Sequence, residues 1–125
     1  DFDSYMISDD SFYLGDFRLL EVDNRLILPI NFFCRFVLTS SDVIHSWSLP
    51  VFFLKMDVMS GLLNILNFNF NLVGIFYGQC SEICGANHSF MPVVLELTLF
   101  DFFKSWILFL KKNVFYLKII FFLFF

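Results

Sequence analysis

The sequence predicts a mainly β domain, a sandwich or barrel with Greek-key connections, that ends in a helix. Two observations support this fold class. Short apolar runs of strand length follow one another from Phe17 to Leu99, and glycines separate several of them. From about residue 101 the apolar residues recur with the period of a helix instead. The length of 125 residues fits one domain with a core of ordinary size.

Seven runs are expected to form strands, and the first two flank a pair of residues that suits a tight hairpin turn. Asp23 and Asn24 both tolerate the left-handed backbone conformation that such a turn requires. Glycines at turn positions punctuate the later runs. The expected strands cover Phe17–Val22, Arg25–Pro29, Phe32–Leu38, Val51–Val58, Leu62–Phe68, Val73–Tyr77 and Val93–Leu99.

The last 25 residues differ from the rest and are predicted to form an apolar helix or tail, so we expect a division into 1–100 and 101–125. Asp101 suits the N-cap of a helix that begins at Phe102. From Trp106 to Phe125 the chain is mostly apolar, but three lysines interrupt it. A spanning helix needs about 20 apolar residues with few charges. We therefore expect a helix that lies on a membrane surface or against another subunit rather than one that spans.

Composition and charge limit the possible partners. The chain is 58% hydrophobic and only 16% charged, with 21 phenylalanines, so it is more apolar than an average soluble domain. The net charge is −4, and acidic residues are concentrated in the first 23 positions. This distribution argues against nucleic-acid binding, which requires a basic contact face. An acidic face suits a basic protein partner; the alternative is that acidic loops only keep an apolar protein in solution.

One short loop concentrates the residues that carry chemistry. Cys80, Cys84, His88 and Met91 lie within twelve positions, at spacings of four, four and three. Thiolate and thioether sulfurs are soft donors and imidazole suits copper, whereas a thioether is a poor ligand for zinc, magnesium or calcium. The methionine therefore favours copper.

The two cysteines predict a site for two copper ions. A single-copper electron-transfer site uses one cysteine, two histidines and a weak axial ligand, whereas two cysteines can bridge two ions through both sulfurs. Each ion then needs one imidazole and one weak donor. The chain has only two histidines, so His45 would join His88. The remaining weak donor can be a backbone carbonyl, with Glu82 placed between the cysteines.

Each of these residues has a simpler explanation when it is taken alone. Cys80 and Cys84 could form a disulfide or half of a zinc site. Met91 could fill the core, and His45 could be a structural histidine. Four donors of matched softness in one loop favour copper over these alternatives. Cys34 has no metal-binding partner at loop spacing and is expected to be a buried core residue.

The sequence resembles the copper-binding domain of cytochrome c oxidase subunit II from about Phe2 to Trp106. The segments that carry the resemblance are Ser4–Ile7, Arg18–Arg25, Asp42–Trp47, Leu54–Asp57 and Tyr77–Pro92. The resemblance implies a cupredoxin-like Greek-key barrel that holds two copper ions, the CuA centre. It implies side-chain ligation by His45, Cys80, Cys84, His88 and Met91, and ligation by the backbone carbonyl of Glu82. The carboxylate of Glu82 would bind a magnesium ion shared with subunit I.

The resemblance also implies a role in respiration. Cytochrome c would give electrons to this centre, with Asp42 among the acidic docking residues, and the centre would pass them to haem a in subunit I. Oxygen reduction and proton translocation by complex IV would occur there. The domain would face the intermembrane space at the mitochondrial inner membrane, or the periplasm in a bacterium. Family members carry two spanning helices before this domain, so we expect the front half of subunit II on a separate chain or in a missing part, beside other complex IV subunits.

Three alternatives remain at this point. The first is the same copper domain in another terminal oxidase or in nitrous oxide reductase, whose loop is similar. A second alternative is a one-copper binding or assembly module, and a third is a structural subunit with a vestigial site. The match over Arg18–Arg25 and the apolar composition favour the oxidase.

Overall fold

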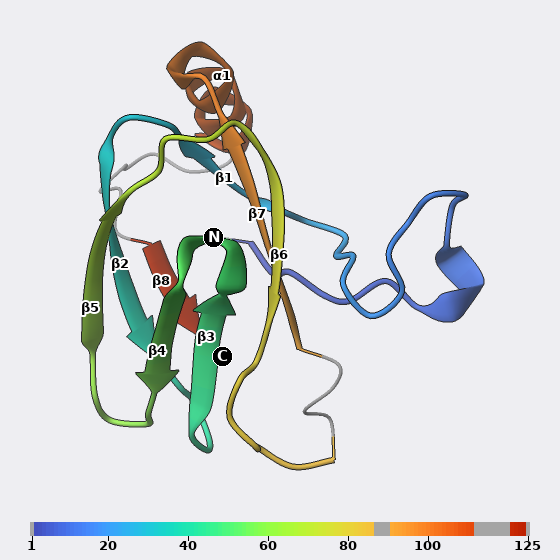
Figure 1. Ribbon diagram of the computed structural model, residues 1–125, viewed down its shortest axis with the longest axis vertical. Helices are drawn as coiled ribbons and strands as arrows, with labels where there is room; N and C mark the ends of the chain where they lie inside the picture. Colours follow the sequence, from blue (N-terminus) through green and yellow to red (C-terminus); the bar gives the residue numbers. More distant parts are fainter. Residues whose placement is uncertain (1, 87–90, 112–120, 125) are drawn as a thin grey trace.

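The computed structural model describes residues 2–86, 91–111 and 121–124, with the side chains described as far as Lys111 (Figure 1). Strands make up most of the regular secondary structure of the described residues, and the one α-helix among these residues, α1, covers Phe100–Lys111. The prediction of a mainly β fold with a helix near the C-terminus is therefore confirmed. The strands are β1 Leu26–Pro29, β2 Phe33–Thr39, β3 His45–Leu49, β4 Leu54–Val58, β5 Asn64–Asn69, β6 Gly74–Gln79, β7 Pro92–Thr98 and β8 Phe121–Phe124; short 3-10 turns cover Asp9–Ser11 and Pro50–Phe52.

The described strands form three small sheets, and the strands that pair within a sheet are mostly distant in sequence. One sheet has the order β1-β7-β6, the second the order β5-β2-β8, and β3 pairs with β4. β1 runs parallel to β7, while β6 and β7 are antiparallel. The chain therefore crosses repeatedly between sheets, as it does in sandwiches with Greek-key connections. Helix α1 covers one end of this arrangement, and the loop around Asp9–Ser11 projects from its side (Figure 1).

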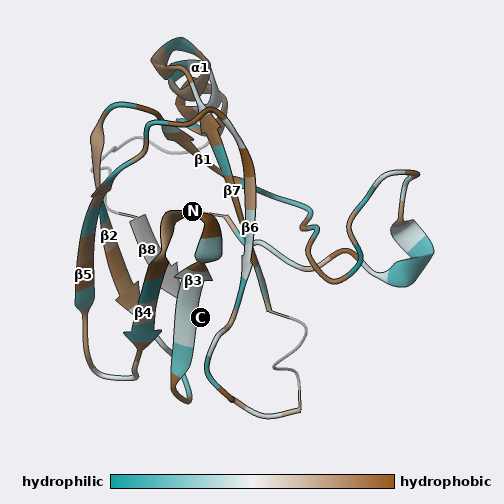
Figure 2. Cartoon of the chain, in the orientation of Figure 1, coloured by the Kyte–Doolittle hydropathy of each residue, from teal (hydrophilic) through white to brown (hydrophobic). Residues whose placement is uncertain are grey.

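The core lies between the sheets and is largely aromatic. Trp47 and Phe36 are almost completely buried, with ring centroids 5.1 Å apart, and Phe70 meets Phe36 edge to face at 6.1 Å. Aromatic pairs at such separations stabilise a core beyond their area burial. The hydropathy colouring shows β2 as mostly hydrophobic and the projecting loop at Asp9–Ser11 as hydrophilic (Figure 2). Many of the phenylalanines thus have a packing role.

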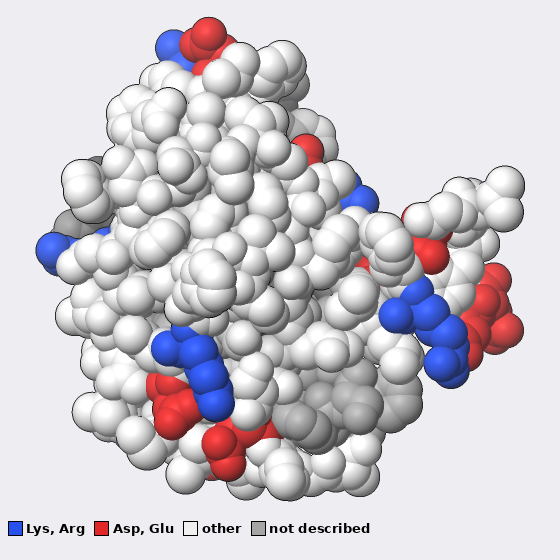
Figure 3. All heavy atoms as spheres, in the orientation of Figure 1, with Lys and Arg blue, Asp and Glu red and all other residues white. Residues whose placement is uncertain are grey.

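The apolar composition also reaches the surface. Leu14, Phe33 and Phe53 are all more than four-fifths exposed. One broad face of the molecule carries almost no charged residues at its centre (Figure 3). Exposed apolar surface of this kind is typical of proteins that contact other subunits.

The predicted hairpin at Asp23-Asn24 is wrong. Residues 18–20 form turns and Val22 makes only an isolated bridge with Met6, while β1 pairs with β7 instead. The reason is that the turn residues bind elsewhere: Asp23 Oδ1 accepts a hydrogen bond from the backbone of Tyr5, and the Asn24 side chain donates to the Asp3 carbonyl. Such side chain-to-backbone bonds compete with regular turn geometry.

Strand β3 was not predicted from the sequence. Its five residues are all buried, but three of them, His45, Ser46 and Ser48, are polar and hide the apolar pattern of a buried strand. The next predicted strand, Val51–Val58, begins later than expected, because Pro50 opens a 3-10 turn and Phe53 adopts a positive φ of 53°. The remaining five runs all contain strands close to their predicted bounds.

The C-terminal segment differs from the prediction in two respects. Helix α1 begins at Phe100, so Asp101 lies in its first turn and is not its N-cap. Phe121–Phe124 form β8 parallel to β2, so these four residues of the expected apolar helix or tail are not helical. Trp106 packs α1 against Phe2, with ring centroids 5.8 Å apart. Among the residues that the structure describes, no helix has the length and apolar character needed to cross a bilayer.

Candidate metal centre

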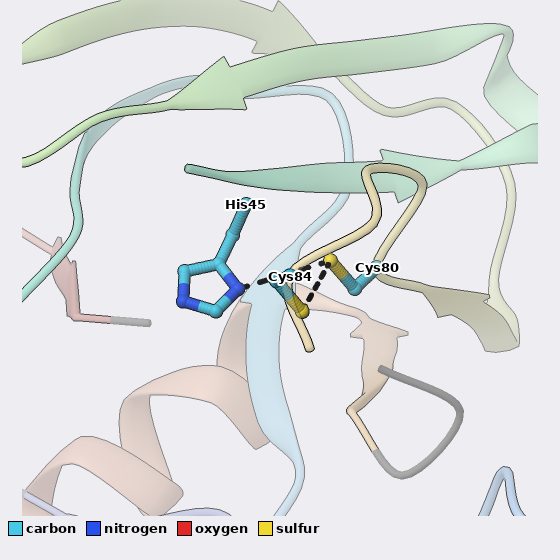
Figure 4. A group of neighbouring side chains, drawn as sticks. All are labelled: His45, Cys80 and Cys84. Atoms are coloured by element: carbon cyan, nitrogen blue, oxygen red, sulfur yellow. Dashed lines mark hydrogen bonds between the residues drawn. The ribbon is translucent and has the colours of Figure 1, made fainter. Parts of the chain in front are cut away.

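Three segments of the chain meet at one end of the sheets and bring the predicted metal ligands together (Figure 4). His45 is the first residue of β3, and Cys80 directly follows β6. Cys84 lies in the loop that leaves β6, and Met91 directly precedes β7. The site therefore depends on the packing of β3 against β6 as much as on the loop itself.

Backbone contacts fix the distance between these segments. The N–H of Ser81 donates to the Ser46 carbonyl at 3.1 Å, and the N–H of Cys80 donates to the Met91 carbonyl at 3.1 Å. Gly78 permits this approach, because a Cβ at that position would lie 1.8 Å from the carbonyl oxygen of Ser48. A side chain cannot fit at such a distance, so a glycine is required where β6 crosses β3.

The donor atoms form a compact cluster. One ligand atom each from His45, Cys80 and Cys84 can be chosen so that all lie within 4.8 Å of one another. The two Sγ atoms are 3.9 Å apart, and His45 Nδ1 is 3.9 Å from Cys80 Sγ (Figure 4). A disulfide bond is about 2.0 Å long. The two cysteines are therefore not joined by a disulfide bond in this structure, and the disulfide alternative is not observed.

Two weaker donors border the cluster. Met91 Sδ lies 3.5 Å from Cys84 Sγ, and the carbonyl oxygen of Glu82 lies 3.2 Å from Cys80 Sγ. The Glu82 side chain is partly buried. His88, the fifth predicted side-chain ligand, lies outside the described residues. The two thiols and the thioether are soft donors and the imidazole suits copper, so this set, with one carbonyl as a weak donor, fits copper.

The electrostatic surroundings of His45 include a residue whose role the sequence did not reveal. Asp42 Oδ1 lies 2.8 Å from His45 Nε2. Burial alone would lower the pKa of His45, but its hydrogen bonds to Asp42 and Cys80 outweigh burial and raise the pKa above its usual value. The hydrogen bond to His45 lowers the pKa of Asp42 in turn. An Asp-x-x-His spacing at the start of a strand was the only signal available.

The three cysteines have different environments. Cys80 is 5% exposed, whereas Cys84 is only partly buried. Burial, followed by the hydrogen bond with Cys80, raises the pKa of the Cys84 thiol. Cys34 is buried in the apolar core, as predicted, and burial raises the pKa of its thiol as well.

Known proteins resemble this chain in sequence and in structure. The family described as "Cytochrome C oxidase subunit II, periplasmic domain" matches residues 1–98. "Cytochrome c oxidase subunit 2" of Ascaris suum is 63% identical over 106 residues, which are 85% of this chain and 46% of that protein. The corresponding protein of Caenorhabditis elegans is 59% identical over the same length. The chain thus spans about half the length of the curated relatives it matches.

Two solved structures share the fold. The periplasmic domain of subunit II of cytochrome oxidase of Bradyrhizobium japonicum has a TM-score of 0.80 and 42% identity, covering 90% of this chain and 78% of that one. A mixed-disulfide intermediate between a thioredoxin-like protein and subunit II of cytochrome c oxidase has a TM-score of 0.74 and 40% identity, covering 90% and 75%. This likeness confirms the cupredoxin-like fold that the sequence resemblance implied.

Proposed function

The chain belongs to the cytochrome c oxidase subunit II family, and from this premise we propose that it is the electron-transfer domain of a cytochrome c oxidase. It would accept electrons from cytochrome c and pass them to haem a in subunit I. The observation that carries the proposal is the cluster of two thiols and one imidazole within 4.8 Å, which the start of β3 and the loop after β6 bring together.

The site would hold two copper ions. Cys80 and Cys84 would hold them through their thiolate sulfurs, and His45 and His88 would each supply an imidazole. Met91 and the Glu82 carbonyl would be the weak donors. Their positions beside Cys84 Sγ and Cys80 Sγ support this assignment. When bound, a copper pair supplies a one-electron carrier whose change in charge is shared between two ions.

The protein's own residues would keep the structural reorganisation around the metal site small. His45 is 4% exposed and Cys80 is 5% exposed, so water has little access to these two ligands. The hydrogen bonds from Cys80 and Ser81 to neighbouring segments fix the loop at both ends. A rigid, largely dry site limits the movement of ligands and solvent during electron transfer, because fewer dipoles must reorient around the changing charge.

Glu82 would serve a second metal. Its carbonyl faces Cys80 Sγ, which leaves the carboxylate available for a magnesium ion at the boundary with subunit I. Oxygen ligands of this kind suit magnesium. The Asp42 side chain, 64% exposed, would be available to a basic face of cytochrome c. The domain would lie at the mitochondrial inner membrane and face the intermembrane space, and the match to a family described as a periplasmic domain supports a position outside the bilayer.

The two expected parts of the chain would have different tasks. The family match ends at residue 98, which supports a copper domain over 1–100. Residues 101–125 would contact another complex IV subunit or the membrane surface. The exposed side chains of Phe102 and Phe109 on α1 support such a contact.

A thioredoxin-like protein would prepare the site for copper. The structural relative in the mixed-disulfide complex supports this step. If Cys80 and Cys84 were oxidised to a disulfide, a dithiol partner would reduce it: the partner's first thiolate would attack one sulfur, and its second thiol would release the chain with both cysteines reduced and the partner oxidised. Reduction is necessary because the thiolate, not the disulfide, binds metal.

Metal analysis with electron spin resonance on the copper-loaded chain tests the proposal. We expect two coppers per chain and a hyperfine pattern from one unpaired electron shared by two nuclei. Cys80→Ser and Cys84→Ser should both abolish that pattern, whereas Cys34→Ala, at the third cysteine, should keep it. A single copper that survives Cys84→Ser would instead support the one-copper module and contradict the proposal.

A further inference from the structure

One carboxylate oxygen connects the buried imidazole of His45 to the protein surface. Asp42 Oδ1 lies 2.8 Å from His45 Nε2 and also accepts hydrogen bonds from the backbone N–H of Val43 at 2.7 Å and from the Ser40 hydroxyl at 3.2 Å. His45 is 4% exposed, while the Asp42 side chain is 64% exposed. The carboxylate is thus fixed by the loop before β3, although it stands in solvent.

This contact determines which ring nitrogen carries the proton. An ionised carboxylate only accepts hydrogen bonds, so His45 Nε2 must be the donor in this pair. In a neutral imidazole the other nitrogen is then unprotonated and acts as an acceptor. That nitrogen, Nδ1, is the one that faces Cys80 Sγ at 3.9 Å. The tautomer selected by Asp42 is therefore the one that can bind a metal among the sulfurs.

We propose that Asp42 is a positioning residue of the metal centre: it holds the His45 ring with Nε2 protonated and Nδ1 turned to the cysteines, and it increases the electron donation of that ring. The inference rests on the proposed function, in that it takes the cluster to hold copper. It gives Asp42 a role within the isolated domain, separate from any docking of a partner. A hydrogen-bonded carboxylate makes a ligating imidazole more basic and fixes its orientation.

The direction of the effect on the reduction potential follows from charge. A more strongly donating imidazole stabilises the oxidised, more positive state of a bound metal relative to the reduced state. Removal of the carboxylate should therefore raise the potential and weaken binding. Loss of a partner of this kind typically lowers metal affinity by about 10- to 100-fold.

The experiment compares Asp42→Ala, Asp42→Asn and the control Asp10→Asn, which removes the same charge from an exposed site in the projecting loop. In the copper-loaded chain with no partner present, we expect Asp42→Ala to lower copper affinity about 10- to 100-fold and to raise the potential. Asp42→Asn should lie between Asp42→Ala and the wild type, because its amide oxygen can accept the Nε2 proton without the charge. Affinity and potential equal to those of Asp10→Asn in both variants would overturn the inference.

A second measurement on the metal-free chain separates this inference from the proposed function. Nitrogen NMR of the His45 ring should show the Nε2-protonated tautomer in the wild type and a loss of that preference in Asp42→Ala. A ring protonated at Nδ1 in the wild type would overturn the inference, whether or not copper binds. A wild-type chain that shows the Nε2 tautomer but takes up no copper would refute the proposed function alone. Thermal unfolding of each variant shows whether its fold is intact.

Discussion

The hydroxyl of Tyr77 on β6 donates a 2.7 Å hydrogen bond to Glu21, a carboxylate that is only 5% exposed. Arg25 lies 3.4 Å from the other oxygen of Glu21 and 3.7 Å from Glu96 on β7. A phenol, a guanidinium and two carboxylates thus join the loop before β1 to the β6–β7 pair. Burial and the neighbouring Glu21 raise the pKa of Tyr77 to about 12.

Tyr77→Phe should destabilise the fold. The substitution leaves the buried Glu21 carboxylate without one charge-assisted hydrogen bond, which costs about 1.5–3 kcal/mol. Urea unfolding followed by circular dichroism measures the loss. Tyr13→Phe is the matched control, since Tyr13 is 81% exposed and should tolerate the change. Equal stability of the two variants would show that the Tyr77–Glu21 bond contributes nothing.

The same hydrogen bond predicts a dependence of stability on pH. The folded pKa of Tyr77, about 12, lies above the usual value of 10.0, so the neutral phenol is favoured by folding. This contribution is complete below about pH 10 and is lost as pH rises through the folded pKa. Between about pH 10 and pH 12, the wild type should therefore lose more stability than Tyr77→Phe, as measured by urea midpoints at each pH. Parallel curves for the two proteins would contradict the raised pKa.

Gly78→Ala should separate β6 from β3 and damage the metal centre. The new Cβ would lie 1.8 Å from the Ser48 carbonyl oxygen, and backbone must move to relieve the clash. We expect loss of copper binding and destabilisation of roughly 1–3 kcal/mol, the range for overpacking. Gly15→Ala is the control, because a Cβ at position 15 would meet no atom within 4 Å. This variant carries only the conformational penalty of a φ of 100°. Normal copper uptake by Gly78→Ala would show that the crossing does not position the ligands.

The thiols should react with iodoacetamide in order of their exposure. Cys84 is partly buried, whereas Cys80 and Cys34 are buried. In the metal-free native chain we expect Cys84 to be alkylated first, and all three cysteines to react at similar rates in urea. Mass spectrometry of timed samples gives the order. Faster labelling of Cys34 than of Cys84 would contradict the burial of the core cysteine.

Met91→Leu should retain copper but change the reduction potential, because a weak axial donor tunes the metal more than it holds it. The position of Met91 Sδ, 3.5 Å from Cys84 Sγ, supports this role. Voltammetry of the copper-loaded chain measures the shift, with Met6→Leu in the N-terminal segment as the control. An unchanged potential in Met91→Leu would mean that Met91 only packs against the loop.

The sequence predicted those features that depend on local pattern. Strands β5, β6 and β7 were predicted because apolar residues and glycine turns mark them, and the loop from Cys80 to Met91 was recognised because its donors are close in sequence. Strand β3 was missed because its polar residues are buried through tertiary packing. The predicted hairpin at Asp23 does not form, because the Asp23 side chain accepts a hydrogen bond from the backbone of Tyr5, eighteen residues away along the chain. Long-range contacts of this kind leave no periodic signal.

The ring orientation of His45 illustrates the same limit within the site. Counting histidines was sufficient to nominate His45 as a ligand, but not to show which nitrogen faces the cysteines. That detail depends on the contact with Asp42, for which the family resemblance implied only a role in docking. The crossing at Gly78 was likewise invisible, because its partner, Ser48, lies on another strand thirty residues earlier.

The pairing of β1 with β7 has a consequence for how the protein is made. Leu26 emerges from the ribosome long before Leu95, its partner in register. β1 therefore cannot pair with β7 until most of the domain has been synthesised. Pairings this distant form late, because the intervening chain must first be ordered. His45 likewise has no thiol beside it until Cys80 has been synthesised. The nascent chain therefore has no finished pocket to offer, and insertion of metal must follow synthesis.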